Sequence, residues 1–415
     1  MSDRMRSAET ALTGVTVLQM VSSFGRSSFG AGYGISNLSA ALSRAGVDVF
    51  LVSMDEEKEA YEVCEDLGFP REKLVRASLI VHQRFRFSPF LLSRLLEITK
   101  GRKVILHSHG TWTYMAYLAG RLRRKLQCPQ VFMPHGELEP YALGISRKKK
   151  AIASLLFARR NLREVSCVCA LSEQEQTSIR NLGYAGRVEV IPYGMNSTSS
   201  RSEAEVSDFR ARHNVAPGLR VMLFLSRIAP KKNLPMLLNA FATVSKLRPG
   251  WKLLIAGGDE RGHIHEVRQL IKDLRIDDSV SLIGPVYGQE KACALTSASV
   301  FVLPSHSEGL PIAVLEAMEY GKPVLITDGW TLPVKTNASY GWRVPVDQKA
   351  FENALLDAMS TSDDKLSAMG QAARSTVREH FNWDAVAKQA CSLYASLLDG
   401  SRDGADSHIE GEAFR

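Results

Sequence analysis

Short apolar runs alternate along the chain with longer segments whose apolar residues recur at helical spacing. The ranges of these runs, several of which include the turn that follows the run, are residues 15–21, 47–52, 104–110, 131–137, 165–171, 188–196, 220–226, 251–259, 280–286, 301–304 and 341–345. Short apolar runs without strict polar alternation are typical of parallel strands buried on both faces. The alternation with helical segments therefore predicts an α/β fold built from doubly wound parallel sheets.

A stretch rich in serine and charge at residues 197–205 interrupts this alternation near the middle of the chain. We interpret it as a linker and hinge between an amino-terminal domain, residues 1–196, and a carboxyl-terminal domain, residues 206–380. A terminal helix is expected at residues 381–399. The polar segment 400–415 is expected to be disordered. The sequence thus predicts two Rossmann-like domains of ordinary size, facing each other across a cleft.

The composition of the 415-residue chain narrows its possible partners. A formal net charge of +8 favours phosphorylated substrates, acidic lipid surfaces or nucleic acid. Nucleic acid is the weakest of the three, because no recognisable nucleic-acid-binding module accompanies the charge. The six cysteines are scattered without metal-ligand spacing, so buried free thiols in a reducing cytoplasm are expected. A polar start and the lack of a long apolar run predict a soluble or peripheral protein.

The most informative chemical pattern lies at residues 301–327, which predict a strand, a loop, a helix and a second strand. Pro311 suits the first position of the helix, because its missing N–H would be unpaired there. The amides and the positive dipole end of this helix would face the loop that holds Glu308. Glu316 lies about 10 Å further along the helix. Two carboxylates so placed can bind different parts of an elongated ligand. The alternative is that both are ordinary surface carboxylates that only contact water.

A cationic turn follows the strand predicted at residues 220–226. Arg227 and Lys232 at such a strand-to-helix turn can neutralise a diphosphate leaving group, and solvated surface charge is the alternative. In the first half, Gly30 and Gly32 precede a helix expected at residues 35–44. Glycines there permit close approach of the backbone to a ligand, but their spacing does not match a dinucleotide fingerprint and a plain loop remains an alternative.

Three histidines stand at the carboxyl ends of predicted strands: His107, His109 and His135. Strand ends are where α/β sheets place ligands, so a chemical role is plausible beside a structural one. A zinc site formed by the three is a rival hypothesis, weakened because the segment offers no further carboxylate or thiol ligand apart from Glu137.

The Glu-x7-Glu spacing of Glu308 and Glu316, with the Ser-Arg-x4-Lys spacing at residues 226–232, resembles the signature of retaining glycosyltransferases of family four. That family has the glycosyltransferase B fold of two Rossmann-like domains. The resemblance covers nearly all of residues 15–398, and its carboxyl-half motifs are more specific than those of the amino half. It implies that the terminal helix crosses back onto the first domain.

For the donor, the resemblance implies that Glu308 faces the sugar and Glu316 the ribose, while Arg227 and Lys232 bind the phosphates. Because Pro311 lacks an N–H, an amide contact there must come from a neighbour. Asn233 stands where the family often has glycine, which leaves the geometry of that turn open. The expected donor-binding set is Gly30, Gly32, Arg227, Lys232, Gly284, Pro285, Glu308, Gly309, Leu310, Pro311, Ile312 and Glu316.

For catalysis, the resemblance places His135 beside the anomeric carbon, together with Arg227, Lys232 and Glu308. His109 and Glu137 are expected on the acceptor side. No cofactor or metal is required, because the two cations can neutralise the diphosphate.

The expected function is a retaining hexosyltransferase that moves a hexose from a UDP- or GDP-sugar to a glycan hydroxyl. Basic amphipathic stretches at residues 84–100 and 146–160 can lie on an anionic membrane. With the family likeness, they favour a lipid-linked oligosaccharide as acceptor in surface polysaccharide synthesis, on the inner face of the plasma membrane. A non-hydrolysing sugar-nucleotide epimerase and a catalytically silent glycan-binding or membrane scaffold are the alternatives.

Overall fold

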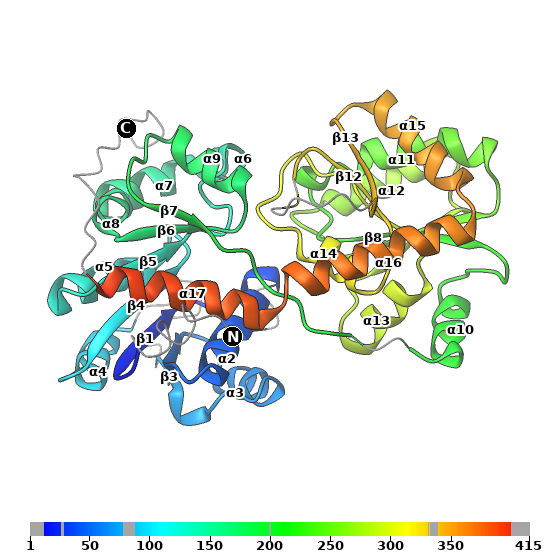
Figure 1. Ribbon diagram of the computed structural model, residues 1–415. Coiled ribbons are helices and arrows are strands. Elements are labelled where there is room, and N and C mark those ends of the chain that lie inside the picture. The colour runs from blue at the N-terminus through cyan, green and yellow to red at the C-terminus, as the bar shows by residue number, and fades with distance from the viewer. Residues whose placement is uncertain are drawn as a thin grey trace. The chain divides into compact units, whose positions relative to one another are not determined.

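The computed structural model describes residues 12–25, 29–77, 88–198, 201–330, 332 and 339–399. The chain divides into two compact units, as Figure 1 shows. The first unit consists of Met1–Gly194 and Asn382–Arg415, and the second is Met195–Phe381. The helix predicted at the carboxyl terminus is thus part of the first unit, although some 190 residues of the second unit precede it in the sequence.

The first unit is built on a seven-stranded parallel sheet with the order β3-β2-β1-β4-β5-β6-β7. Its strands are β1 (Val15–Met20), β2 (Asp48–Ser53), β3 (Leu74–Arg76), β4 (Lys103–His109), β5 (Gln130–Met133), β6 (Cys167–Ala170) and β7 (Val188–Val190). Its helices are α2 (Phe29–Arg44), α3 (Glu57–Asp66), α4 (Leu91–Ile98), α5 (Tyr114–Leu126), α6 (Pro140–Gly144), α7 (Arg147–Ala153), α8 (Arg159–Glu164), α9 (Glu173–Asn181) and α17 (Trp383–Leu398). A π-helical turn, η3 (Ser154–Ala158), joins α7 to α8, and a short 3-10 turn, η2 (Arg71–Lys73), precedes β3.

The second unit has a six-stranded parallel sheet with the order β10-β9-β8-β11-β12-β13. Its strands are β8 (Arg220–Leu225), β9 (Trp251–Ala256), β10 (Val280–Gly284), β11 (Val300–Leu303), β12 (Val324–Thr327) and β13 (Gly341–Val344). Its helices are α10 (Glu203–Arg212), α11 (Leu234–Leu247), α12 (His263–Leu274), α13 (Gly288–Ser297), α14 (Ile312–Glu319), α15 (Gln348–Ser360) and α16 (Asp363–His380), with a 3-10 turn η4 (Pro230–Lys232). The two parallel sheets with their helices confirm the predicted α/β class and doubly wound architecture.

The strand orders explain where each unit can bind a ligand. In each sheet the order reverses beside the first strand, between β1 and β4 in the first unit and between β8 and β11 in the second. The loops that leave these two strands diverge to opposite sides of the sheet, and the crevice between them is the usual ligand site of open α/β sheets. The segments predicted to carry chemistry follow these strands.

Buried apolar side chains hold the helices on the first sheet. One cluster joins β1, β4 and α5 through Leu18, Leu106 and Leu118. A second joins β5 and β6 to α8 and α9, and contains Phe132 and Leu162. These side chains come from strands buried on both faces, which is why their sequences are mostly apolar.

Helix α17 packs against α2 within the first unit, as Figure 1 shows. The ring of Trp383, its first residue, lies so close to Gly194 that a β-carbon there would be 2.7 Å from the indole. Tyr193 packs in the same way on Gly34, where a β-carbon would lie 1.9 Å from its ring. Both glycines are therefore required by close packing rather than by a flexible backbone.

Helix α2 begins at Phe29, six residues before the predicted start at residue 35, so the prediction of a glycine-rich loop there was wrong. Gly30 and Gly32 lie in its first turns. The hydroxyl of Ser36 donates to the carbonyl of Gly32 at 2.9 Å, and the amide of Asn37 donates to the carbonyl of Tyr33 at 2.8 Å. These side chains support the first turns of a helix whose glycines contribute little helical propensity of their own.

The predicted linker at residues 197–205 is also partly helical. Helix α10 begins at Glu203, where Ser202 and Glu205 form a capping box. Ser202 Oγ accepts a hydrogen bond from the Glu205 N–H, and the Glu205 carboxylate accepts one from the Ser202 N–H at 3.0 Å. The capping box stabilises the first turn of α10, so the helix starts at Glu203, inside the segment whose serine-rich composition suggested a linker through residue 205.

Candidate functional site

The cationic turn after β8 and the acidic loop after β11 lie side by side, because β8 and β11 are neighbouring strands. The N–H of His306 donates to the carbonyl of Lys231 at 2.9 Å and joins the two segments directly. Two residues 75 positions apart in the sequence are thereby brought to one sheet edge.

Lys232 and Glu308 form a buried ion pair at this edge. Lys232 Nζ lies 2.5 Å from Glu308 Oε1, and both side chains are 10% exposed. Ser305 Oγ also donates to Glu308 Oε1 at 2.5 Å. An ammonium has three N–H donors, so Lys232 can hold Glu308 and still donate to a second anion.

The ionised form of Glu308 is favoured in spite of its burial. Burial raises the pKa of the carboxyl, but the nearby ammonium groups of Lys232 and Lys231 and the hydrogen bonds from Lys232 and Ser305 outweigh it and lower the pKa. Glu308 is therefore ionised at neutral pH.

The turn that carries Lys232 ends in a left-handed residue. Asn233 has φ 52° and ψ 42°, and α11 begins at the next residue. Asparagine adopts this conformation more readily than most side chains do. Asn233 therefore makes the turn that glycine would otherwise provide, which answers the question left open by the sequence.

Two ion pairs at this edge were missed from the sequence. Glu316 on α14 pairs with Lys291 on α13, whose Nζ lies 2.6 Å from Glu316 Oε1. Arg227, half exposed, pairs with Glu260 rather than with Glu308. Neither partner stands in a recognisable motif, so no pattern in a single sequence would have found them.

Apart from Gly30 and Gly32, which lie on α2 of the first unit, the other predicted donor residues lie on loops and helix starts of the second unit. Gly309, Leu310 and Pro311 precede α14, which begins at Ile312, one residue after the predicted start. Gly284 ends β10 with φ 76°, and its carbonyl accepts from the Gly257 N–H at 2.8 Å, before Pro285. A β-carbon on Gly257 would lie 1.8 Å from the carbonyl oxygen of Ser226, so glycine is required where β9 ends beside the cationic turn.

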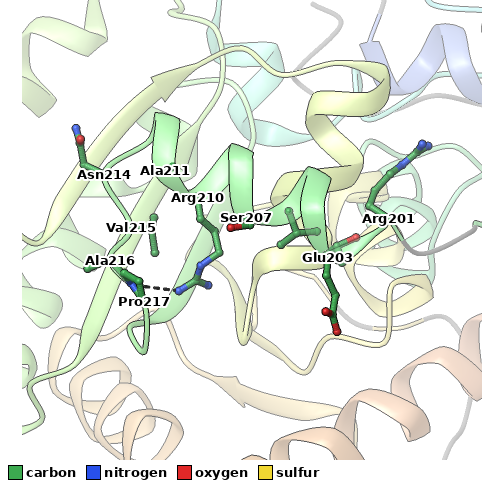
Figure 2. A pocket seen from close by; sticks show the side chains of 11 residues that line it. Arg201, Glu203, Ser207, Arg210, Ala211, Asn214, Val215, Ala216 and Pro217 are labelled. Carbon is green, nitrogen blue, oxygen red and sulfur yellow. Dashed lines mark hydrogen bonds between the residues drawn. The ribbon is translucent and has the colours of Figure 1, made fainter.

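The second unit also has a cavity of about 610 Å³ beside α10, away from these residues (Figure 2). Arg210 projects from α10 toward the loop that contains Ala216, and its guanidinium donates to the carbonyls of Ala216 and Leu219 at 3.3 and 2.6 Å. The guanidinium therefore ties the loop to the helix. None of the residues that line this cavity is a predicted site residue.

In the first unit, the histidines at the ends of β4 and β5 stack on one another. The rings of His107 and His109 are 4.5 Å apart between centroids, and those of His109 and His135 are 5.2 Å apart. His107 and His109 are buried, whereas His135, with φ 56°, is partly exposed. Among the described residues no group of three or more His, Cys, Asp or Glu side chains is arranged to hold a metal ion.

Glu137 and Glu175 fix the loop after β5 through backbone amides. Glu137 Oε2 accepts from the N–H of Thr111 at 2.5 Å. Glu175, on α9, accepts from the N–H groups of Gly136 and, at 2.7 Å, Leu171. Burial raises the pKa of both carboxyls, that of Glu175 to about 7, with a further contribution from the nearby Glu139 and Glu137. The structural role of Glu175 was not foreseen from the sequence.

Glu175 should make the protein less stable as pH rises from about 4.5 to about 7. In this window the folded protein keeps a proton on Glu175 that the unfolded chain has released, so each pH unit lowers the free energy of unfolding by up to ~1.4 kcal/mol. We expect Glu175→Gln to remove this part of the pH dependence in urea unfolding between pH 5 and 7.5. Glu173→Gln, an exposed change on the same helix, is the control. Equal pH slopes for wild type and Glu175→Gln would contradict the prediction.

All six cysteines are free thiols, and all but Cys128 are buried, as the sequence predicted. No helix in the described part of the chain combines the length and apolarity needed to cross a membrane.

Two family models match the chain, one on each unit. Residues 205–376 match the model described as glycosyl transferases group 1, and residues 29–194 match the glycosyl transferase 4-like domain. Together they take in most of the chain.

Among curated proteins, the alpha-monoglucosyldiacylglycerol synthase of Streptococcus pneumoniae is 26% identical over 299 residues, which is 70% of this chain and 66% of that protein. The amylovoran biosynthesis glycosyltransferase AmsD of Erwinia amylovora is 24% identical over 345 residues, 81% of this chain and 88% of that protein. Other relatives, such as the putative colanic acid biosynthesis glycosyltransferase WcaL of Salmonella typhimurium, are matched over about half their length (50%).

Among solved structures, HepE of Anabaena in complex with UDP and glucose has a TM-score of 0.73 at 18% identity, covering 92% of this chain and 99% of that one. This likeness shows that the two chains share a fold. With the two family models, the parallel sheets and the Glu308 and Lys232 motifs at one sheet edge, it follows that the chain belongs to the family-four-like glycosyltransferases of the glycosyltransferase B fold.

Proposed function

We propose that the protein transfers a hexose, with retention of anomeric configuration, from a UDP- or GDP-hexose to a hydroxyl of a glycan. The buried pair of Lys232 and Glu308 beside the start of α14 is the observation that carries this proposal. It offers a phosphate-binding ammonium and a sugar-facing carboxylate at the strand-order reversal of the second unit. The relatives that make polysaccharides, and the neighbour solved with UDP and glucose, support the same reading.

In this proposal the leaving diphosphate is stabilised by charge. Lys232 and Arg227 neutralise the phosphates, and the amides at the start of α14 add the positive end of the helix dipole. Glu308 orients the sugar and Glu316 the ribose. Arg227 must first exchange Glu260 for a phosphate oxygen, which an exposed ion pair allows at little cost. The two cations make a metal ion unnecessary.

The proton of the acceptor hydroxyl needs a base. We propose front-face displacement, in which the bond from the anomeric carbon to the diphosphate oxygen breaks while the acceptor oxygen attacks from the same face. The departing phosphate oxygen takes the acceptor proton. His135 orients the sugar, and His109 and Glu137 belong to the acceptor side. His135 is held neutral, since burial lowers its pKa to about 3, so it does not compete for this proton at neutral pH.

The experiment that tests the reaction is incubation of the purified protein with a panel of UDP-, GDP- and ADP-hexoses, with and without a lipid-linked oligosaccharide acceptor. We expect nucleoside diphosphate release that depends on the acceptor, and an α-linked product from an α-linked donor. An isomerised sugar nucleotide formed without acceptor would instead identify an epimerase. Nucleotide binding without any release would identify a catalytically silent scaffold.

A basic apolar face on the first unit suggests where the acceptor is met. We define this face as Arg147, Lys148, Lys149, Ile152, Leu155, Leu156, Arg160 and Arg163, all of them exposed. Ile152, Leu155 and Leu156 are 60%, 88% and 71% exposed. Residues 145–163 contain seven Lys and Arg and no Asp or Glu. The π-helical turn η3 inserts one additional residue per turn at Ser154–Ala158, the segment that presents both leucines.

Three exposed aliphatic side chains ringed by cations fit an anionic bilayer surface, where the apolar groups enter the interface and the cations meet lipid phosphates. We therefore propose a peripheral position on the inner face of the plasma membrane and a lipid-linked acceptor in surface polysaccharide synthesis. Of the other basic stretch, residues 84–87 lie outside the described residues, and Phe90 is 71% exposed just before α4.

A further inference from the structure

A chain of buried hydrogen bonds runs from the loop after β5 to the carboxyl-terminal helix. His135 Nε2 lies 3.0 Å from His109 Nδ1, and His109 Nε2 lies 2.7 Å from Gln19 Oε1. Gln19 Nε2 lies 3.3 Å from the hydroxyl of Tyr394 on α17 and 3.3 Å from His107 Nδ1. At the other end, the hydroxyl of Tyr193 lies 3.2 Å from His135 Nδ1. Gln19, the fifth of the six residues of β1, is fully buried and links both ends of the chain of hydrogen bonds.

The amide of Gln19 sets the direction of the hydrogen bonds that join Gln19, His109 and His135. Its carbonyl oxygen can only accept, so His109 must donate from Nε2. A neutral imidazole has one N–H, which leaves His109 Nδ1 as an acceptor, and His135 must then donate to it from Nε2. His135 Nδ1 is left as an acceptor for the hydroxyl of Tyr193.

The histidines of the chain are neutral, as this reading requires. Burial lowers the pKa of His135 to about 3, and burial with the neighbouring His107 and His135 lowers that of His109 well below its usual range. With both rings neutral over the physiological range, the tautomer rather than the charge decides which hydrogen bonds His135 can make. An Nδ1 lone pair accepts a hydrogen bond from a hydroxyl, whereas an Nδ1–H group would repel the hydroxyl hydrogen.

We infer that Gln19 is a positioning residue that acts through His109 to hold His135 in its Nε2–H tautomer, so that His135 Nδ1 accepts a hydroxyl hydrogen bond. Gln19 is too deeply buried to touch a substrate itself. The inference rests on the role proposed for His135 and adds to it a buried residue 116 positions away that no motif contains.

Two measurements test this inference, and one of them needs no substrate. Ring ¹⁵N chemical shifts of His109 and His135, assigned from His→Gln variants, report which nitrogen carries the proton. We expect Nε2–H for both rings in the wild type and a mixture of tautomers in Gln19→Met, which keeps the volume of the side chain and loses its carbonyl. We expect kcat to fall about tenfold, the size of one buried hydrogen bond, with donor and acceptor KM within about twofold.

Strand β5 of the same sheet provides a matched control. Gln130 on β5 is 2% exposed and donates from Nε2 to Ser108 Oγ at 2.7 Å, outside the chain. Gln130→Met should change folding stability by a similar amount and leave the ring shifts and kcat unchanged. Tyr394→Phe should leave the tautomers of His109 and His135 unchanged, because it keeps the hydrogen bond that His109 Nε2 donates to Gln19 Oε1.

An Nδ1–H tautomer in the wild type, or unchanged ring shifts in Gln19→Met, would overturn the inference. An equal fall of kcat in Gln130→Met would also overturn it, since a general packing defect would then explain both. If the protein proves to transfer no sugar, the ring shifts still decide whether Gln19 sets the tautomer, so the two failures can be told apart.

Discussion

Replacing Lys232 with alanine should lower kcat by about a thousandfold, in line with the loss of a group that stabilises developing charge in a dry site. Lys232 is the buried cation of the proposed donor site, and its ammonium would meet the diphosphate as negative charge builds on the leaving oxygen. Arg227 is half exposed and already paired with Glu260, so it cannot replace a buried ammonium. The measurement is single-turnover transfer with a saturating donor.

Loss of the ammonium also affects folding, and this effect must be separated from catalysis. Lys232→Ala leaves Glu308 buried without its counter-ion, and breaking such a pair costs about 3–5 kcal/mol. The pKa of the Glu308 carboxyl should rise, because burial is then opposed by Lys231 and the hydrogen bond from Ser305 without the larger contribution of Lys232. We expect the double variant Lys232→Met with Glu308→Gln to recover most of the melting temperature and none of the activity.

Lys246, exposed at the end of α11, is the charge-matched control for this prediction. Lys246→Ala removes the same charge from the same unit and should transfer at the wild-type rate. Near wild-type transfer by Lys232→Ala would show that the leaving group is stabilised elsewhere and would remove the central assignment. Recovery of activity in the double variant would show instead that the single variant failed through misfolding.

The parts of the fold that the sequence predicted correctly are those set by local pattern. Parallel strands buried on both faces must be mostly apolar, so β8 and β11 stand out as apolar runs. The start of α14 was predictable within one residue, because Pro311 suits only the beginning of a helix. Motif spacing then placed Glu308 and Lys232, which the structure brings together.

The errors lie where local composition conflicts with packing. The glycines at residues 30–34 suggested a loop, but α2 includes them, and Gly34 is required by the ring of Tyr193, 159 residues away in the sequence. The serines at residues 197–202 suggested a longer linker, but the Ser202 capping box starts α10 within it.

The partners that a single sequence could not identify are long-range ones. Glu260 pairs with Arg227 from another strand-to-helix loop, and Lys291 reaches Glu316 from a neighbouring helix. Gln19 meets Tyr394 across 375 residues of sequence. Nothing in the spacing of such residues records their contact, because the topology of the sheet decides which strand ends and helices become neighbours.

Replacing both Leu155 and Leu156 with aspartate should lower binding to anionic vesicles by roughly a hundredfold. Burying each leucine in the bilayer interface is worth at least about 1.5 kcal/mol, and ~3 kcal/mol for the pair corresponds to about two powers of ten in partitioning. The two side chains are 88% and 71% exposed, so their loss should leave the melting temperature unchanged. Flotation with vesicles of phosphatidylglycerol mixed with phosphatidylcholine measures the partition.

Charge and apolarity on the basic apolar face can be separated. Lys148→Glu with Lys149→Glu keeps the leucines and removes two cations. Each cation contributes about 1 kcal/mol to binding near an anionic surface, so this variant should bind anionic vesicles more weakly. The binding that remains should depend less on salt concentration than that of the wild type. Leu247→Asp with Val346→Asp is the matched control for the double leucine variant, because it also replaces two exposed aliphatic side chains with aspartate, but in the second unit. This control variant should bind vesicles as the wild type does. Equal recovery of the wild type on anionic and neutral vesicles would exclude the anionic membrane as partner of this face, because the five cations of the face must favour an anionic surface if they touch it.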